Sequence, residues 1–115
     1  MKNVPLRESS NVTLDSSGNG FARVGPISSR EIWHPQNAHI SANTNPTNEA
    51  ICTIYVGRDI SQPNFRDISY SGSSGDTSGR IDSDTIYVGQ YVYAQWANGD
   101  PGALATLTVT GNKDI

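Results

Sequence analysis

The stretch that decides the fold is DTIYVGQYVYAQWANGDPGALATLTVTG, residues 84–111 of a chain of 115. Side chains on a β-strand alternate between its two faces. Residues 91–96 separate in this way into an apolar and a more polar set, Val92, Ala94 and Trp96 against Tyr91, Tyr93 and Gln95. Residues 103–110 alternate too, and one of their faces is mostly threonine. Because the turn sequence NGDPG joins the two segments, they predict a β-hairpin that closes a small β-sandwich.

Strand patterns separated by polar turns recur along the rest of the chain. No segment keeps an apolar period of 3.6 residues, and Pro and Gly interrupt every stretch long enough for a helix. About eight short antiparallel strands therefore predict an all-β, single-domain β-sandwich of jelly-roll or Greek-key type. The other predicted strands are residues 11–15, 21–24, 30–34, 39–43, 50–56, 65–71 and 85–88.

The chain has the size of one domain. We assign residues 1–10 to an N-terminal arm, residues 11–115 to the sandwich and residues 71–79, SGSSGDTSG, to a surface loop. The glycines of SSGNG, residues 16–20, suit a tight turn that joins the first two strands of the sandwich in a hairpin. Alternation predicts a core of Val12, Leu14, Cys52, Ile54, Val56, Val92, Ala94, Trp96, Leu107 and Val109.

Charge and hydropathy disfavour two classes of partner. Eleven acidic and eight basic residues give a net charge of −3, and the basic residues are scattered singly. Nucleic-acid binding needs clustered Lys and Arg, so we expect none. No apolar run approaches a membrane span, and MKNVPLRESS at the N-terminus lacks the apolar stretch of a signal peptide. We therefore expect no membrane partner and synthesis in a cytoplasm.

Candidate chemical groups are few. His34 and His39 are the two histidines, and their spacing puts them on opposite faces of an extended strand unless Pro35 interrupts it. Four aspartates offer oxygen ligands to calcium but lack the other positions of an EF-hand loop, namely Asp76, Asp82, Asp84 and Asp100. No G-x-S-x-G elbow occurs. We predict no enzyme activity, no metal and no cofactor.

The aromatic residues suggest a contact surface. Trp33 and Trp96 are expected in the core because of their large apolar area. If Trp96 faces the core, Tyr91 and Tyr93 are displayed together, on a subunit interface or as a platform for sugar rings. The opposite parity would bury the tyrosines and display Trp96. The predicted interface residues are Tyr91, Tyr93, Thr106, Thr108 and Thr110.

Three motifs together resemble a known family. They are NVTLDSSGNGFARVGP at residues 11–26, ICTIYVGRDISQPNFRD at residues 51–67 and GQYVYAQWANGDPGALATLTVTG at residues 89–111. In order and spacing they resemble small accessory virion proteins of tailed bacteriophages, particularly those that infect actinobacteria. The resemblance implies a compact β-sandwich that decorates a capsid or tail, often as a trimer, and it implies no catalytic residue. It leaves head, collar and tail open as the location.

We therefore expect a non-enzymatic virion structural protein, assembled in the host cytoplasm. It would form a trimer and bind a capsid or tail protein at many repeated positions. The alternative is a carbohydrate-binding or host-receptor-binding β-sandwich, in which Tyr or Trp stacks on a surface glycan while Asp and Asn bond its hydroxyls. Oligomerisation without glycan affinity favours the first function, and glycan binding by a monomer favours the second.

Overall fold

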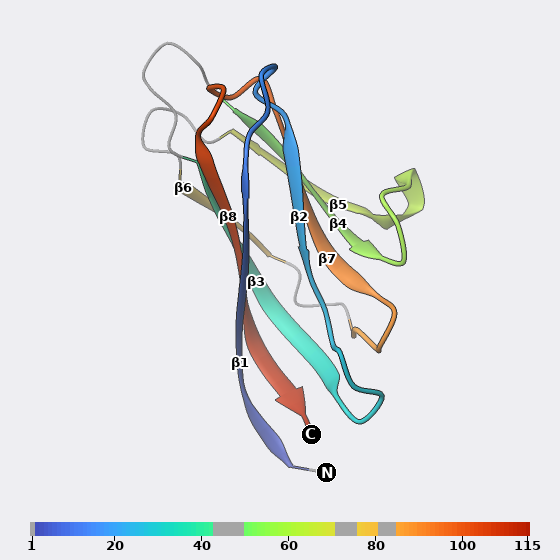
Figure 1. The fold of residues 1–115 in the computed structure, drawn as a ribbon. Coiled ribbons are helices and arrows are strands. Elements are labelled where there is room, and N and C mark those ends of the chain that lie inside the picture. Colours follow the sequence, from blue (N-terminus) through green and yellow to red (C-terminus); the bar gives the residue numbers. More distant parts are fainter. Residues whose placement is uncertain (1, 43–49, 71–75, 81–84) are drawn as a thin grey trace.

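The computed structural model describes residues 2–42, 50–70, 76–80 and 85–115, and these form two antiparallel sheets packed face to face (Figure 1). The elements are β1 (Asn3–Thr13), β2 (Gly20–Val24), β3 (Ile32–Ala42), β4 (Ile51–Gly57), the 3₁₀ turn η1 (Gln62–Asn64), β5 (Phe65–Tyr70), β6 (Asp76–Arg80), β7 (Tyr91–Ala97) and β8 (Leu104–Asp114). The β1 sheet has the order β1-β8-β3-β6, and the β2 sheet has the order β2-β7-β4-β5. The predicted all-β sandwich is confirmed.

The strands pair in a nested order. β1 pairs with β8, β2 with β7, β3 with β6, and β4 with β5. Two more pairings, β3 with β8 and β4 with β7, join these pairs into the two sheets. Among the described strands, β4 and β5 are therefore the one consecutive pair that shares a sheet.

Both hairpins predicted from the sequence are wrong. The turn sequence at residues 98–102 leads from β7 in the β2 sheet to β8 in the β1 sheet. The turn at residues 16–20 likewise leads from β1 to β2 in opposite sheets. Alternation shows which side chains of a strand are buried. Two neighbouring strands of one sheet and two strands of facing sheets both bury an apolar face, so both arrangements give the same alternation. The pattern therefore does not identify the partner strand.

Three predicted element boundaries also differ from the structure. Residues 30–34 and 39–43 were expected as two strands, but residues 32–34 and 39–42 belong to the single strand β3. Of the predicted loop 71–79, residues 71–75 lie outside the described part, and the rest belongs to β6 at the edge of the β1 sheet. An edge strand is held by backbone hydrogen bonds, so its composition need not be apolar. Residues 85–88 contribute one bridge, between Ile86 and Trp33.

A bulge lets β3 continue past its proline. Pro35 is opposite Gly111 of β8, and the register shifts before Asn37, which leaves Gln36 as the extra residue. A Cβ on Gly111 would clash with the backbone of His34 to Gln36, so the close approach of the two strands requires glycine there. The bulge also resets the alternation, and His34 and His39 both face outward. His34 and His39 are therefore not on opposite faces of the strand, because the bulge after Pro35 interrupts the regular alternation of β3.

Residues 3–10 form the first part of β1 and are not a separate arm. They pair with β8 from Asn3, opposite Asp114, onward. Leu6 is 2 % exposed and packs in the core, which ties this segment to the sandwich. Beyond the strands, Lys2 and Ile115 exchange backbone hydrogen bonds of 3.1 and 2.9 Å.

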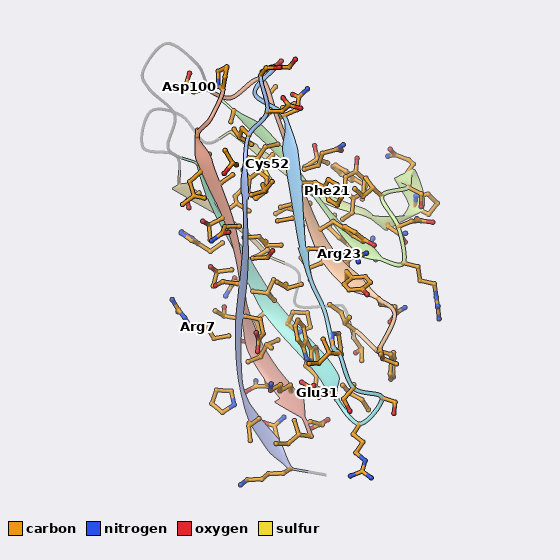
Figure 2. The ribbon with its side chains drawn as sticks, in the orientation of Figure 1. Arg7, Phe21, Arg23, Glu31, Cys52 and Asp100 are labelled. Carbon is orange, nitrogen blue, oxygen red and sulfur yellow. The ribbon has the colours of Figure 1, made fainter. Side chains whose placement is uncertain are left out.

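The side chains buried between the sheets are those that the alternation along each strand predicted. Nine of the ten predicted residues are buried, and the tenth, Val12, is partly buried against them. Trp33 and Trp96 are both buried, as expected. Cys52 lies between the sheets (Figure 2), and burial raises the pKa of its thiol to about 12. The thiol therefore stays protonated and acts as a small apolar side chain.

The ends of β1, β3 and β8 meet in a polar cluster. Asp114 lies 3.0 Å from His34 Nε2, and it accepts a hydrogen bond of 3.2 Å from Asn3 Nδ2. The hydrogen bond with His34, followed by the one from Asn3, lowers the pKa of the Asp114 carboxyl. Next to it, Lys113 Nζ is 3.2 Å from Glu31 Oε1.

Truncation of Ile54 tests the core. Ile54 is fully buried, so Ile54→Ala is expected to lower the free energy of unfolding by about 2–5 kcal/mol. The matched control is Ile27→Ala, because that side chain is 93 % exposed; the expected change is below about 0.5 kcal/mol. Urea unfolding followed by tryptophan fluorescence measures both variants. Equal effects would contradict the assignment of this face to the core.

The Asp114 cluster gives a pH dependence of stability. The pKa of this carboxyl is lower in the folded than in the unfolded chain. Its ionised form therefore stabilises the fold above about pH 4, and the contribution is lost as the pH falls through the folded pKa. Asp114→Asn is expected to be less stable than the wild type at neutral pH, with the difference shrinking in acid. A difference that stays constant in denaturant titrations from neutral pH to about pH 3 would contradict this.

Candidate functional site

An aromatic row crosses the outer face of the β2 sheet. The register aligns Arg23 of β2, Tyr93 of β7, Tyr55 of β4 and Phe65 of β5. Their side chains point away from the core, because the residues that alternate with them on β2, β4 and β7 are buried. Tyr91 lies on the same face of β7. We refer to these five residues as the aromatic row: Arg23, Tyr55, Phe65, Tyr91 and Tyr93.

The side chains of the aromatic row contact one another. The rings of Tyr55 and Phe65 meet edge to face, with centroids 6.2 Å apart. The rings of Tyr91 and Tyr93 are 5.7 Å apart. The guanidinium carbon of Arg23 lies 4.2 Å from the centroid of the Tyr91 ring, which is cation–π geometry. These contacts fix the side chains before any partner binds.

The two tyrosines of the predicted interface differ in exposure. Both tyrosines lie on the face of β7 that points away from the core, as predicted, since Trp96 on the opposite face is buried in the core. Tyr93 is nevertheless only 5 % exposed, and its hydroxyl donates a hydrogen bond of 3.0 Å to the Arg58 carbonyl. Tyr91 is partly buried, and Phe65 is 37 % exposed. Phe65 was missed in the sequence because pairing with Tyr55, not local spacing, places it in the row.

The predicted threonines lie on the other side of the sandwich. Thr106, Thr108 and Thr110 are partly buried on the outer face of β8, which is a central strand of the β1 sheet. Ser9 of β1 and Thr108 share a hydrogen bond of 2.9 Å between their hydroxyls. We refer to this surface as the threonine face. The structure therefore does not bring the tyrosine pair and the threonines together.

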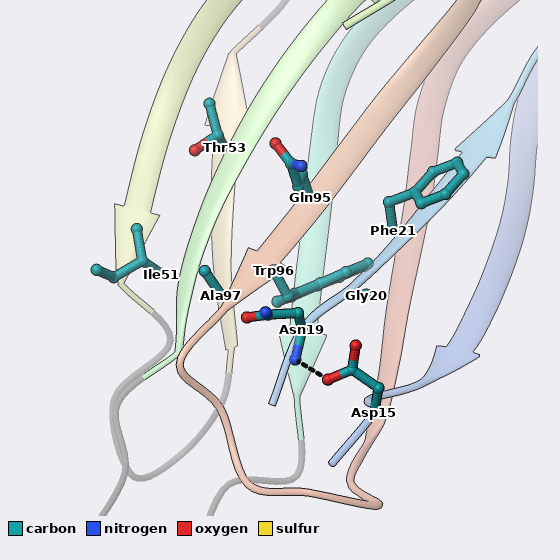
Figure 3. A pocket seen from close by; sticks show the side chains of 9 residues that line it. All are labelled: Asp15, Asn19, Gly20, Phe21, Ile51, Thr53, Gln95, Trp96 and Ala97. Atoms are coloured by element: carbon teal, nitrogen blue, oxygen red, sulfur yellow. Dashed lines mark hydrogen bonds between the residues drawn. The ribbon is translucent and has the colours of Figure 1, made fainter. Parts of the chain in front are cut away.

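A pocket of about 470 Å³ lies beside Phe21 (Figure 3). Phe21 is on the same face of β2 as Arg23 of the aromatic row, because the two residues alternate with buried Ala22. The register puts Phe21 of β2, Gln95 of β7 and Thr53 of β4 in one line across the sheet. Phe21 is 55 % exposed and, like Arg23, projects from β2 (Figure 2). The pocket is lined by Asp15, Asn19, Gly20, Phe21, Ile51, Thr53, Gln95, Trp96 and Ala97.

The turn between β1 and β2 supplies the polar end of the pocket. Asp15 Oδ1 accepts hydrogen bonds from the backbone N–H groups of Ser17 at 2.8 Å and Asn19 at 3.0 Å. These bonds, the one from Asn19 first, lower the pKa of the Asp15 carboxyl, so it is ionised at neutral pH. Gly18 has a φ of 77°, and a Cβ there would clash with the Gly99 backbone. Only glycine allows this contact between the two turns.

Several polar groups in the pocket are unpaired within the part of the chain that the structure describes. The side chains of Thr53 and Gln95 form no hydrogen bond there. Asn19 accepts one through Oδ1 from the Asn98 N–H at 3.3 Å, which leaves its NH₂ group free. Trp96 Nε1 also lacks a partner among those same residues, but it is buried with the core side of Trp96 and is not open to a ligand. The pocket therefore combines free donors and acceptors with the exposed ring of Phe21.

A second, smaller pocket of about 190 Å³ includes Glu31, Trp33 and Lys113 in its lining. Its polar groups are already paired. Glu31 Oε1 lies 3.2 Å from Lys113 Nζ and accepts a hydrogen bond of 3.4 Å from Trp33 Nε1. This pocket therefore offers a ligand fewer free partners than the one beside Phe21.

The metal-binding candidates are only partly within the described residues. Asp82 and Asp84 lie outside them, and the side chain of Asp76 is not among those described. Among the residues whose side chains the structure describes, no group of three or more His, Cys, Asp or Glu could hold a metal ion. Within residues 2–42, 50–70, 76–80 and 85–115, no helix has the length and hydropathy needed to cross a membrane.

Comparisons with known proteins assign no family to this arrangement. No model of a known protein family matches the chain, and a search of curated proteins finds no match either. The surfaces that bear on its function are therefore the aromatic row, the threonine face and the pocket beside Phe21.

Proposed function

We propose that this chain is a non-enzymatic structural protein of a tailed-bacteriophage virion, a trimeric capsid-decoration module or a related head or tail accessory protein. The observation that carries the proposal is the aromatic row on the outside of a single sandwich. An outer sheet face normally presents polar side chains to water, so aromatic rings gathered on one, with Phe65 exposed and Tyr55 and Tyr91 partly exposed, suit an interaction surface. The order of motifs along the chain, which resembles accessory virion proteins, supports the same function.

The strand order supports a finer assignment of the fold. We infer a jelly roll, in which eight strands form two sheets through two Greek keys. The nested pairing of β1 with β8 through β4 with β5 fits this type. Jelly rolls occur in viral capsid domains and also in lectins, so the fold alone does not choose between a virion and a glycan-binding role.

The aromatic row has the composition of an interface between copies of the chain. Tyrosine, phenylalanine and arginine are enriched in interface cores, because each buries a large area, and tyrosine and arginine also carry a polar end that can be satisfied there. Arg23 and Tyr91 are already stacked on each other, so they lose little side-chain freedom when a partner arrives. In a cyclic three-fold arrangement every copy contributes the same pair of patches, one to each neighbour, and the closed ring leaves no interface open.

The threonine face is then free to contact the particle. It lies on the sheet opposite the aromatic row. Short hydroxyl side chains lose less rotamer entropy on contact than long charged ones. Each such contact is weak, but three copies on a repeated particle surface bind together, and the effective affinity rises without any new contact.

Self-association through the aromatic row is measurable. Multi-angle light scattering at micromolar concentration is expected to give a trimer mass for the intact protein. Phe65→Lys puts a charge into the row and is expected to give a monomer. The control is Leu104→Lys, because Leu104 is 46 % exposed at the start of β8 in the other sheet, and it is expected to remain a trimer.

Two results would contradict this interface. One is a monomer mass for the wild type. The other is dissociation by Leu104→Lys but not by Phe65→Lys, which would move the contact to the β1 sheet. Circular dichroism of each variant checks that its β structure is intact.

Presence in the particle is a separate prediction. Mass spectrometry of phage particles purified from the strain that carries the gene is expected to detect this chain, and its gene is expected beside capsid, portal or tail genes. A chain that is abundant in the lysate but removed by particle purification would rule out the virion role, even if the protein were a trimer.

A further inference from the structure

We propose that the pocket beside Phe21 binds one sugar ring of a neutral glycan. This site is additional to the structural role, and it does not depend on the trimer interface. The residues that carry it are Phe21, Thr53, Gln95, Asn19 and Asp15. None of them belongs to the aromatic row.

The shape of the pocket fits a small ring-shaped ligand. Its volume of about 470 Å³ lies in the usual range for small-molecule sites, roughly 300–1,000 Å³. Figure 3 shows Phe21 on one side of it, Thr53 and Ile51 on the other, and Gln95 between them. A ligand in this position has an exposed aromatic ring on one flank and polar groups below it.

Phe21 supplies the apolar contact that sugar rings use. One face of a pyranose carries mainly C–H groups, and these pack against the negative face of an aromatic ring. Phe21 is 55 % exposed although it lies within a strand, whereas its neighbour Ala22 on β2 is buried. The exposed ring of Phe21 therefore offers an apolar surface beside the polar groups of the pocket, which is the combination that the two kinds of surface on a sugar ring require.

The polar groups match the hydroxyls of a sugar. A hydroxyl both donates and accepts, so it suits a site that offers both kinds of group. Gln95 and Thr53 each present a donor and an acceptor, and Asn19 presents its NH₂ group, since its Oδ1 already accepts from Asn98. Asp15 keeps Oδ2 as an acceptor, because the turn bonds involve Oδ1.

The charge of the pocket selects against anions. Asp15 is the one charged residue among the described residues of the lining, and the backbone N–H groups of Asn19 and Ser17 hold its carboxylate ionised. A phosphate or an acidic sugar would meet this negative charge without a cation in the lining to offset it. The site therefore favours a neutral polyol.

The site is formed before a ligand binds. The turn that carries Asp15 and Asn19 is fixed by its own backbone bonds, by Gly99 N–H donating to Gly18 O at 3.0 Å, and by Asn98. Gln95 and Thr53 lie on adjacent strands of the β2 sheet.

The test uses the full chain and a panel of methyl glycosides of glucose, galactose, mannose and N-acetylglucosamine. Saturation-transfer NMR is expected to detect at least one of them, with a dissociation constant in roughly the millimolar range, as is usual for a single small ligand with few contacts. Amide shifts in ¹⁵N spectra are expected to centre on Phe21, Thr53 and Gln95.

Variants locate the binding. Phe21→Ala is expected to weaken it by about tenfold or more, whereas Phe21→Tyr keeps the ring and is expected to stay within about threefold. Thr53→Val keeps the shape, removes the hydroxyl and is expected to weaken binding while the fold is retained. Phe65→Lys, in the aromatic row, is the control and is expected to leave the glycoside affinity unchanged.

Three results would overturn the proposal. They are no response to any glycoside in the panel, binding that survives both Phe21→Ala and Thr53→Val, and inorganic phosphate that shifts the same amides as strongly as a glycoside does. Light scattering of Phe21→Ala separates this site from the proposed interface. A trimer that no longer binds the glycoside leaves the structural role intact, and a monomer that still binds it leaves the sugar site intact.

Discussion

The pairing of the first strand with the last is the constraint on which the rest of the structure depends. β1 and β8 are each 11 residues long and pair along their whole length, from Asn3 opposite Asp114 to Thr13 opposite Leu104. All inner strand pairs are nested within this one. Such long-range pairing costs loop-closure entropy, which must be offset by burial of the core between the sheets. The hydrogen bonds of Asp114 with Asn3 and His34 hold β1 and β3 against the far end of β8.

The local sequence pattern predicted which side chains are buried but not which strands are neighbours in a sheet. Ile54 and Trp96 were placed in the core by alternation alone, because period-2 burial is a property of one strand. The partner of a strand depends on how the apolar faces of all strands pack together. The alternation of apolar and polar residues is the same whether two strands form a hairpin or lie in facing sheets. That is why the turn at residues 98–102 was assigned to a hairpin. The β3 bulge depends on Pro35 meeting Gly111 across the sheet, which no local rule contains.

The candidate site was predicted only where its residues lie close together on one strand. Tyr91 and Tyr93 were found because they lie two residues apart on one strand. The pocket was missed, because its lining comes from three strands and a turn that only the fold brings together. The one local signal for it was the exposed parity of Phe21 within residues 21–24. The glycine-rich turns also had a different role from the one expected. They pack Gly18 against Gly99 and so fix the polar end of the pocket.

The two proposals reinforce each other through multivalency. A shallow pocket with one aromatic flank and four polar groups binds a single sugar ring only weakly, since a small ligand gains little per atom after its ordering costs. Three pockets on one trimer, and many trimers on one particle, would face a glycan surface that repeats the same unit. The second and later contacts then occur at high effective concentration, and weak sites give firm but reversible attachment. A deep, high-affinity pocket would be a disadvantage there, because it would hold the particle on any free sugar or detached fragment.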